Sequence, residues 1–190
     1  MKDKLIFLLY NLAISVLLPV VLIIQTVKDL KKNKLSRCVA SWKMRLAGYG
    51  KSKEAVIWIH LASVGETIAA RDLVHQLAQT SKHKLLITNN TVTGYNTTAR
   101  LFSGLIKQER LMHILSPYDT YLIMRRFFLS FEIKLIIVME AEIWPNLLRR
   151  AKKLKIPSVL INARLSAPAL RKRYILRHIV ASYINLFSII

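Results

Sequence analysis

From Ala55 onward, short apolar runs rich in β-branched residues alternate with longer segments of helical spacing. Runs this short and this continuously apolar are typical of strands that are buried on both faces of a sheet. The predicted strands cover residues 55–62, 84–90, 110–116, 134–142 and 157–163. Because strands that alternate with helices form a parallel sheet with helices on both faces, the pattern predicts an α/β fold.

The segments between these runs predict the helices that join the strands. They cover residues 67–79, 91–102 (a loop and a helix), 119–129 and 144–155, and a long last helix covers 166–187. Pro145 falls in the first turn of its helix, where proline is tolerated. Polar side chains at the carboxyl ends of the strands share one edge of the sheet, which is where such folds place their sites.

The first part of the chain differs, because residues 5–27 carry no charged side chain. These 23 residues are enough for a helix to cross a bilayer, and Pro19 would kink that helix without forbidding it. A cleaved signal peptide is disfavoured, since the apolar run is long and leads directly into the basic sequence KDLKKNK. A spanning helix and a helix that lies in one leaflet both remain open. A buried helix of a soluble fold is the weaker alternative, because no polar outer face is evident.

Basic side chains are concentrated directly after the apolar run, which bears on its orientation. Asp29 is the one acidic residue in this stretch. The basic residues are Lys28, Lys31, Lys32, Lys34, Arg37, Lys43 and Arg45. The positive-inside rule therefore predicts that the body of the protein is cytoplasmic. The expected organisation is a membrane-anchor helix over 1–30, a basic linker over 31–54 and an α/β domain over 55–190.

The formal net charge is +20, from 30 basic and 10 acidic residues. Nucleic acid and anionic lipid are the usual partners of so basic a protein. No nucleic-acid-binding motif is present, and the apolar first segment favours lipid. Two basic stretches, 149–155 and 171–177, predict solvated helix faces that an anionic bilayer would attract. The one cysteine, Cys38, cannot form an intramolecular disulfide, and no Cys/His cluster has zinc-site spacing, so no metal is expected.

The turn after the first predicted strand holds the main catalytic candidate. The sequence Ser63-Val64-Gly65-Glu66 leads from strand to helix, and Gly65 would permit a sharp turn. Two interpretations of Glu66 stay open. In the structural one, Ser63 and Glu66 form a capping box at a helix N-terminus, where the helix dipole stabilises a carboxylate. In the functional one, Glu66 is a general base that takes a proton from an attacking hydroxyl.

Two more carboxylates, Glu140 and Glu142, end the fourth predicted strand. Residues two apart in a strand point to the same side, so both would face one sugar or cation. Two solvated acids at a strand end are the alternative. Arg164, after the last strand, is placed to meet a phosphate. His60, inside the first strand, is expected to be a buried, hydrogen-bonded side chain rather than a ligand.

A polar loop follows the second predicted strand and contains Asn89, Asn90, Thr91 and Thr93. It would bind sugar or phosphate, with ordinary turn chemistry as the alternative. The dinucleotide fingerprint is absent, because the SVGE turn has one glycine where a phosphate-binding loop carries three, and no P-loop sequence occurs. The chain therefore offers no evident nucleotide-binding loop, and no cofactor is expected.

Five blocks of sequence resemble, in order and spacing, the N-terminal domain of 3-deoxy-D-manno-octulosonic acid (Kdo) transferases. The blocks are IHLASVGETIAA, NNTVTGYNTTAR, SPYDT, VMEAEIWPNLL and INARLSAPA. The upstream segment SWKMRLAGYG also resembles the one that joins anchor and first strand in that family.

The resemblance implies the N-terminal half of a GT-B glycosyltransferase, in which two Rossmann-like domains face each other across a cleft. Such an enzyme transfers Kdo from CMP-Kdo to a lipid A precursor (lipid IVA) in lipopolysaccharide biosynthesis, with inversion and without a bound catalytic metal. Glu66 matches the family's proposed base. The expected acceptor-binding residues are Ser63, Gly65, Glu140, Glu142, Asn146 and Arg164.

The final sequence FSII resembles the start of the last strand of that N-terminal domain. The donor-binding domain is therefore expected to be absent or on a separate chain, and residues 1–190 to be inactive alone. The expected partners are the lipid A precursor, CMP-Kdo and the anionic lipids of the inner membrane, on its cytoplasmic face, but no nucleic acid. A non-catalytic membrane protein that binds anionic lipid is the alternative function.

Overall fold

A computed structural model describes residues 2–30, 35–50, 54–140, 142–163 and 183–190 of the chain. The described residues form a five-stranded, all-parallel sheet with the strand order β3-β2-β1-β4-β5. The strands are β1 (Ala55–His60), β2 (Lys84–Asn89), β3 (Leu111–Leu115), β4 (Glu132–Met139) and β5 (Ser158–Ile161). The predicted α/β fold with a parallel sheet is confirmed, because each predicted apolar run contains one of these strands or most of it.

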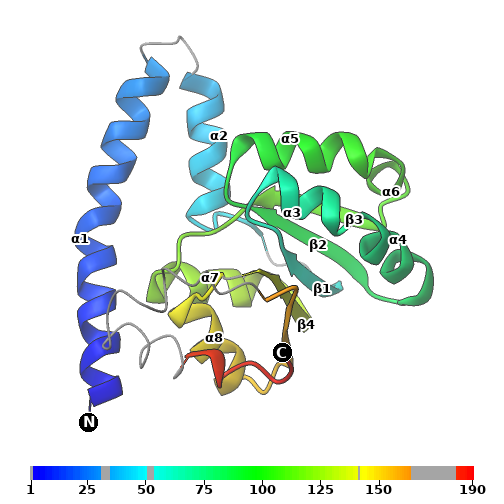
Figure 1. Ribbon diagram of the computed structural model, residues 1–190. Helices are drawn as coiled ribbons and strands as arrows, with labels where there is room; N and C mark the ends of the chain where they lie inside the picture. The colour runs from blue at the N-terminus through cyan, green and yellow to red at the C-terminus, as the bar shows by residue number, and fades with distance from the viewer. Residues whose placement is uncertain (1, 31–34, 51–53, 141, 164–182) are drawn as a thin grey trace.

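Helices connect successive strands and cover both faces of the sheet (Figure 1). One face carries α3 (Val64–Ala69), α4 (Arg71–Thr80), α5 (Val92–Leu101) and α6 (Ser103–Lys107). The other face carries α7 (Tyr121–Ser130) and α8 (Pro145–Lys153). The single helix predicted over 67–79 is two helices, since the chain leaves the helical path at Ala70.

Side chains alternate along β1 and divide the core into two layers. Val56 and Trp58 face α7 and α8, and the ring of Trp58 lies 4.6 Å from that of Phe127, centroid to centroid. Ile57 and Ile59 face the layer of α4. Because β1 is central and covered on both sides, its sequence is an unbroken apolar run up to its last residue.

The end of β4 differs from the prediction. The strand stops at Met139 rather than at residue 142, because Glu140 takes a left-handed backbone conformation with φ of 60°. The expectation that Glu140 and Glu142 point the same way along one strand is therefore wrong.

The predicted last helix also ends early. Most of residues 166–187 lie outside the described residues, but the chain turns at 185–186 and is not helical up to Phe187. Ile189 then pairs in parallel with Val159 beside β5.

The expected basic linker over 31–54 contains a helix that the sequence did not predict, α2 (Leu35–Arg45). Figure 1 shows α2 between α1 and the sheet. Just after it, Ala47 joins the core layer of α7 and α8. This segment therefore connects the first helix to the domain by packing as well as by sequence.

The first helix, α1 (Lys2–Leu30), lies alongside the domain. Its half-buried side chains recur with helical spacing and include Phe7, Tyr10, Asn11, Ile14, Leu18, Leu22 and Gln25. The Tyr10 hydroxyl donates to Asp119 Oδ2 at 2.9 Å, and the Tyr118 hydroxyl donates to Gln25 Oε1 at 3.2 Å. These two polar side chains of the apolar run therefore face the domain.

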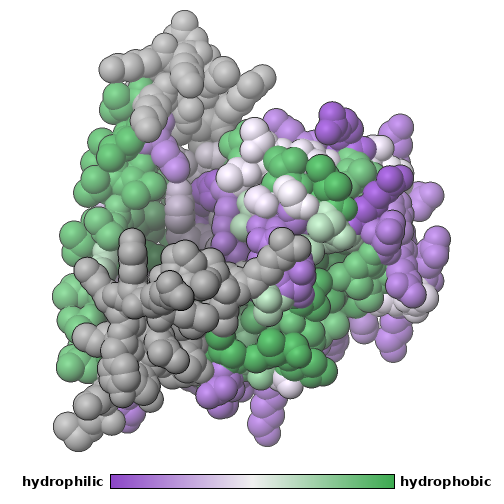
Figure 2. Space-filling view, in the orientation of Figure 1, coloured by the Kyte–Doolittle hydropathy of each residue, from purple (hydrophilic) through white to green (hydrophobic). Residues whose placement is uncertain are grey.

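The opposite side of α1 is apolar and exposed, and we call it the apolar outer face. Its residues are Leu5, Leu8, Leu9, Leu12, Val16, Leu17, Val20, Val21, Ile23, Ile24 and Val27, which are between 39% and 65% exposed. Figure 2 shows this face as a continuous apolar strip along the left edge of the molecule. Residues 4–27 are long and apolar enough to cross a membrane.

Candidate functional site

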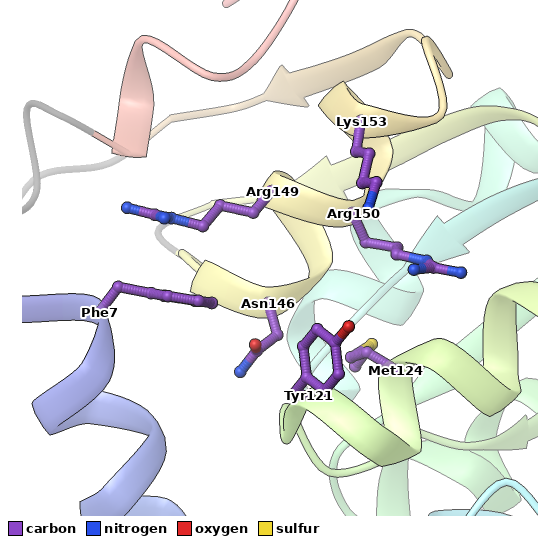
Figure 3. A pocket seen from close by; sticks show the side chains of 7 residues that line it. All are labelled: Phe7, Tyr121, Met124, Asn146, Arg149, Arg150 and Lys153. Atoms are coloured by element: carbon purple, nitrogen blue, oxygen red, sulfur yellow. The ribbon is translucent and has the colours of Figure 1, made fainter. Parts of the chain in front are cut away.

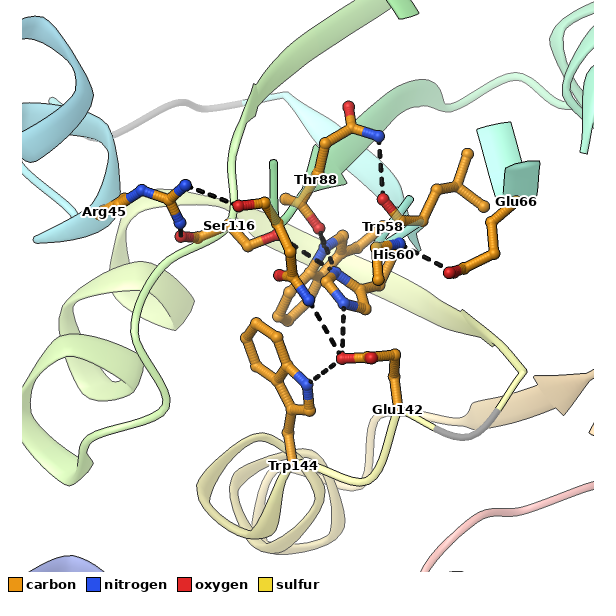
Figure 4. Close-up of polar contacts among 12 residues, drawn as sticks. Arg45, Trp58, His60, Glu66, Thr88, Ser116, Glu142 and Trp144 are labelled. Atoms are coloured by element: carbon orange, nitrogen blue, oxygen red, sulfur yellow. Dashed lines mark hydrogen bonds and ion pairs between the residues drawn. The ribbon is translucent and has the colours of Figure 1, made fainter. Parts of the chain in front are cut away.

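The strand order places a topological switch point at the carboxyl ends of β1 and β4, and we call this region the crevice between β1 and β4. The chain lays down β1, β2 and β3 in one direction and then returns to the other side of β1 to form β4. At such a switch point the loops after the two central strands diverge to opposite faces, and ligands bind between them. The loop after β1 leads to Glu66 and the loop after β4 carries Glu142, so both acidic motifs lie at this crevice (Figure 4).

Glu66 is held in a fixed orientation at the start of α3. Its Oε2 accepts the N–H of Ala62 at 2.8 Å, and its own N–H donates to Ser63 Oγ at 3.2 Å. This pairing is a capping box displaced by one residue, so the structural role of Ser63 as the N-cap is confirmed. The side chain is nevertheless 6% exposed, and glutamate is rarely buried without a partner. Within the described part of the chain, no hydrogen bond engages Oε1.

Gly65 does not make the sharp turn that its sequence position suggested. It lies inside α3, and no described glycine has a positive φ. A Cβ at this position would meet only Ser63 Oγ, at 3.8 Å. The glycine therefore leaves open space in front of the first turn of α3, next to Glu66.

Glu142 is the centre of a polar cluster. Its Oε2 accepts from Trp144 Nε1 at 2.7 Å and from Asn90 Nδ2 at 3.1 Å, and lies 3.6 Å from His60 Nε2. The His60 imidazole lowers the pKa of Glu142 most, and the Trp144 and Asn90 donors lower it further, while partial burial opposes them. Glu142 is therefore held as a carboxylate.

His60 connects this cluster to the sheet. It is fully buried, its Nδ1 lies 2.8 Å from Thr88 Oγ1, and its ring packs 4.5 Å from that of Trp144. Thr88 Oγ1 also accepts from Trp58 Nε1 at 2.9 Å, which frees the threonine proton for His60 Nδ1. The other ring nitrogen, Nε2, faces Glu142 Oε2 at 3.6 Å and has no hydrogen-bond partner among the described residues. The expectation of a buried, hydrogen-bonded histidine is confirmed.

A short relay of hydrogen bonds joins the two carboxylates. Ala62, whose N–H binds Glu66, accepts from the Asn90 N–H at 3.2 Å, and the Asn90 side chain donates to Glu142. Arg45, the last residue of α2, fixes the same loop by donating to Asn90 O at 2.7 Å. Burial lowers the pKa of Arg45 from its ordinary value. A helix that the sequence did not predict therefore supports the crevice.

A pocket of about 370 Å³ opens beside the cluster. Its walls include Tyr10 of α1, Arg45 of α2, Asn90, Tyr118 and Trp144. Aromatic surfaces and polar groups thus line one cavity that borders both the crevice and α1.

Asn146 is turned away from the crevice and supports α8. Asp119 Oδ2 and Oδ1 accept the N–H groups of Asn146 and Leu147 at 3.0 and 2.9 Å, and Asn146 Nδ2 donates to Asp119 O at 2.6 Å. These bonds satisfy donors at the start of the helix that would otherwise lack partners. Burial raises the pKa of Asp119 to about 7, although these donors and the Tyr10 hydroxyl act against the rise.

The polar loop after β2 is mainly structural. Asn89 is fully buried, donates to Leu61 O at 2.8 Å and accepts from Thr98 Oγ1 at 2.9 Å. Thr91 is the N-cap of α5. A Cβ at Gly94 would lie 3.1 Å from Thr91 Oγ1, so a larger residue would require the Thr91 side chain to shift slightly. Of the residues singled out in this loop, Asn90 is the one that reaches Glu142.

Glu140, another predicted site residue, does not join the cluster. Glu140 is half-buried and donates its backbone N–H to Ile161 O at 2.9 Å, and no hydrogen bond to its carboxylate occurs among the described residues. Arg164 lies outside the described residues. Where the structure describes the chain, no group of three His, Cys, Asp or Glu side chains is placed to hold a metal ion.

Sequence reasoning missed the supporting residues Arg45, Trp144 and Asp119. Trp144 and Asp119 fall in the blocks EIWPN and SPYDT, whose resemblance was noted without a role for either side chain. Arg45 is one cation in a basic stretch, and nothing in the sequence separates it from its neighbours.

Sequence comparison identifies a family and several relatives that this chain resembles. Residues 40–190 match the sequence model of a family described as 3-Deoxy-D-manno-octulosonic-acid transferase (kdotransferase). A 3-deoxy-D-manno-octulosonic acid transferase of Bordetella pertussis is 38% identical over 118 residues, which are 62% of this chain and 27% of the relative. The one of Haemophilus influenzae is 42% identical over 112 residues, 58% of this chain and 25% of the relative.

A probable mitochondrial 3-deoxy-D-manno-octulosonic acid transferase of Arabidopsis thaliana is 32% identical over 142 residues, 72% of this chain and 30% of the relative. The matched part of the chain therefore corresponds to between 25% and 30% of the length of these three relatives.

Proposed function

Because this chain belongs to the 3-deoxy-D-manno-octulosonic-acid transferase (kdotransferase) family, we propose that it is the acceptor-binding domain of an inverting GT-B enzyme that moves Kdo from CMP-Kdo to a lipid A precursor. The observation that carries the proposal is the crevice between β1 and β4. There a buried carboxylate, Glu66, and an ionised one, Glu142, are joined through Ala62 and Asn90. Two fixed carboxylates at a switch point suit the binding and deprotonation of a hydroxyl group.

In the proposed reaction, the acceptor hydroxyl approaches Glu66 across the open space at Gly65. Glu66 takes the hydroxyl proton while the oxygen forms a bond to the anomeric carbon of Kdo and the bond from that carbon to the CMP phosphate breaks. The Ala62 N–H holds Oε2, so Oε1 is the oxygen directed to the substrate. Positioned general bases contribute about 10²–10⁴-fold to rate.

Glu142 has a different role in this proposal. Three neighbours already contact its Oε2 and keep it ionised, so it is a poor proton acceptor and a good hydrogen-bond acceptor. We assign it to the hydroxyl groups of the acceptor sugar, with Trp144 as the adjoining wall. Ser63 and Asn146 act by positioning α3 and α8.

Transfer requires a second wall that binds the nucleotide sugar and excludes water. In a GT-B enzyme this wall is a second Rossmann-like domain, which belongs either to a longer form of the same protein or to a separate chain. The proposal therefore assigns CMP-Kdo mainly to that domain and the lipid acceptor to residues 1–190.

The membrane role falls to α1, and we infer that it lies in the plane of one leaflet. The groove that borders Leu18 and Leu22 in the middle of α1 is also lined by Arg126 of α7. A spanning α1 would carry this arginine into the hydrocarbon core, which costs at least about 2.5 kcal/mol. A helix with its apolar outer face in the leaflet avoids that cost and holds the domain at the cytoplasmic face of the inner membrane.

The proposal is tested by Kdo transfer with CMP-Kdo, the lipid acceptor and a supplied donor-binding domain. Glu66→Gln should lower the turnover number by at least about 100-fold without weakening acceptor binding. The matched control is Glu132→Gln, an exposed carboxylate at the opposite edge of the sheet, which should leave turnover unchanged. Full turnover by the Glu66 variant would remove the assignment of the base.

A second candidate, a non-catalytic protein that binds anionic lipid, is favoured by the apolar outer face of α1. It predicts vesicle binding without any Kdo transfer, whichever donor-binding domain is supplied.

A further inference from the structure

Two adjoining cavities separate α1 from the helices α7 and α8. The larger is a groove of about 710 Å³ between α1 and α7, and the smaller is a pocket of about 110 Å³ that also touches α8. Phe7 and Tyr121 line both, so the two cavities are neighbours along one wall. Figure 3 shows the smaller one between Phe7 on α1 and the side chains of α7 and α8. Neither cavity belongs to the crevice between β1 and β4.

The two cavities differ in the chemistry of their walls. Most of the groove is apolar, with Leu8, Leu18, Leu22 and Ile123 among its walls. The pocket is lined by three cations of α8, which are Arg149, Arg150 and Lys153. The groove adds Lys4 and Arg126, and no acidic side chain lines either cavity among the described residues. An apolar channel beside a basic pocket is complementary to an acyl chain joined to an anionic head group.

Arg149 and Arg150 differ in the contacts that their side chains make. The guanidinium group of Arg149 stacks over the ring of Phe7 at 4.0 Å, which fixes it between α8 and α1. Arg150 Nε is buried and has no hydrogen-bond partner among the described residues. Guanidinium donors bind phosphate oxygens well, and Arg150 lines the pocket.

The groove opens on the side of the molecule that carries the apolar outer face. Leu8 belongs to both, and the groove residues Tyr121 and Leu122 of α7 are 54% and 63% exposed. A lipid in the leaflet that surrounds α1 therefore meets the mouth of the groove directly, without leaving the bilayer.

Figure 3 shows the guanidinium groups of Arg149 and Arg150 on opposite sides of the pocket, so the cations of α8 flank it rather than converge on one point. We propose that these cavities form a binding site for one anionic phospholipid of the bilayer, with its head group at the basic pocket of α8 and an acyl chain in the groove between α1 and α7. The lipid joins α1 to α7 and α8 and sets the depth of the domain at the membrane. The site rests on the membrane attachment of α1 and is independent of Kdo transfer.

The site is tested with phosphatidylglycerol that carries a photoreactive diazirine on one acyl chain, at low abundance in phosphatidylcholine vesicles with the full chain bound. Mass spectrometry of the crosslinked peptides should place the adducts on the groove-lining parts of α1 and α7. The same probe with a phosphocholine head group should give at least about tenfold less product, since each cation near an anionic lipid contributes about 1 kcal/mol. Adducts spread evenly over the apolar outer face, or equal yields for the two probes, would overturn the site.

Two variants separate the pocket from the groove. The pocket variant removes all three cations, Arg149→Gln/Arg150→Gln/Lys153→Gln, and should lower the yield of the phosphatidylglycerol adduct about tenfold or more. The control removes the same charge elsewhere, by Arg71→Gln/Lys82→Gln/Lys107→Gln, and should change the yield less than about twofold. Ser15→Trp fills the groove from an exposed position on α1 and should abolish the groove adducts, whereas Ser103→Trp should not.

A competition experiment decides which lipid occupies the site. Unlabelled phosphatidylglycerol should displace the probe. Displacement by an acylated acceptor glycolipid but not by phosphatidylglycerol would overturn the choice of lipid, and an effect of the Arg71/Lys82/Lys107 control equal to that of the pocket variant would overturn the role of the three cations.

Discussion

The crevice between β1 and β4 is formed by buried side chains, whereas the contact of α1 with the domain leaves most side chains of α1 exposed. At the crevice, Glu66 is 6% exposed and His60 is fully buried, and both follow or end strands with neighbours on each side. Along α1, most side chains are exposed, and among the described residues its side-chain hydrogen bonds to the domain are those of Tyr10 and Gln25. The sheet thus fixes the chemical groups, whereas the first helix packs against the domain with one side and leaves the other exposed.

Truncation of the sheet core should have the largest effect on stability. Trp58 is fully buried, packs on Phe127 and donates to Thr88, which in turn contacts His60. Trp58→Ala should lower the free energy of unfolding by about 3–5 kcal/mol. The measurement is urea unfolding followed by circular dichroism. A loss below 1 kcal/mol would show that the sheet does not provide the rigidity assigned to it here.

The next largest effect is expected at Asp119, which contacts both Tyr10 of α1 and the start of α8, and it should depend on pH. Burial raises the pKa of Asp119 from 3.8 to about 7, so the folded protein binds a proton between these values that the unfolded chain has released. Stability from this group is therefore fully present below about pH 4 and is lost as the pH rises through about 7. Relative to Asp119→Asn, the wild type should lose roughly 3 kcal/mol between pH 4 and 7.5.

Urea unfolding of both proteins across this pH range checks the expectation. The difference between the two proteins removes the contributions of other groups, such as Glu142 and His113. A wild type that gains stability over the variant as the pH rises would mean that Asp119 is ionised in the folded protein throughout.

Charged substitutions on the apolar outer face of α1 test whether this face binds the membrane. Leu9→Asp/Leu12→Asp/Val16→Asp should lower binding to anionic vesicles by more than about tenfold, because buried aspartates are unfavourable in the leaflet. Gln76→Asp/Gln79→Asp/Gln108→Asp adds the same charge on the far helices and should reduce binding much less. Both variants should keep the unfolding energy of the wild type, since none of these side chains is in the core. Equal loss of binding in both would point to net charge alone.

The smallest effect is expected at the Tyr10 contact. Tyr10→Phe removes the hydroxyl that donates to Asp119 and should cost about 1 kcal/mol. The loss should disappear in the Asp119→Asn background if the two groups act as a pair. A loss that is unchanged in that background would place the effect in packing rather than in the hydrogen bond.

The sequence predicted the sheet well, because β1 and β4 are central strands whose apolar runs have few alternatives. It failed at Glu140, where one left-handed residue ends the strand and turns Glu142 toward His60. It also missed α2, since a basic stretch of irregular pattern gives little periodic signal. The polar side of α1 was hidden because Tyr10, Asn11 and Gln25 are scattered in sequence and align only once the helix forms.

Individual site residues were predicted less well than the place where they meet. Strand ends indicated the crevice, and the motif blocks indicated Glu66 and Glu142. The roles of Arg45, Asn90 and His60 depend on distances between segments that are 45 to 82 residues apart in the chain, so local pattern could not supply them.

The most direct test of the acceptor-binding assignment is the binding of a lipid A precursor to the chain itself, measured in detergent by isothermal titration calorimetry. The chain should bind the acceptor, Glu142→Gln should weaken binding about tenfold because the loss of a charged hydrogen-bond acceptor costs at least about 1.5 kcal/mol, and Glu66→Gln should bind as the wild type does. Absence of binding, or equal affinity of the wild type and the Glu142 variant, would contradict the placement of the acceptor in the crevice between β1 and β4.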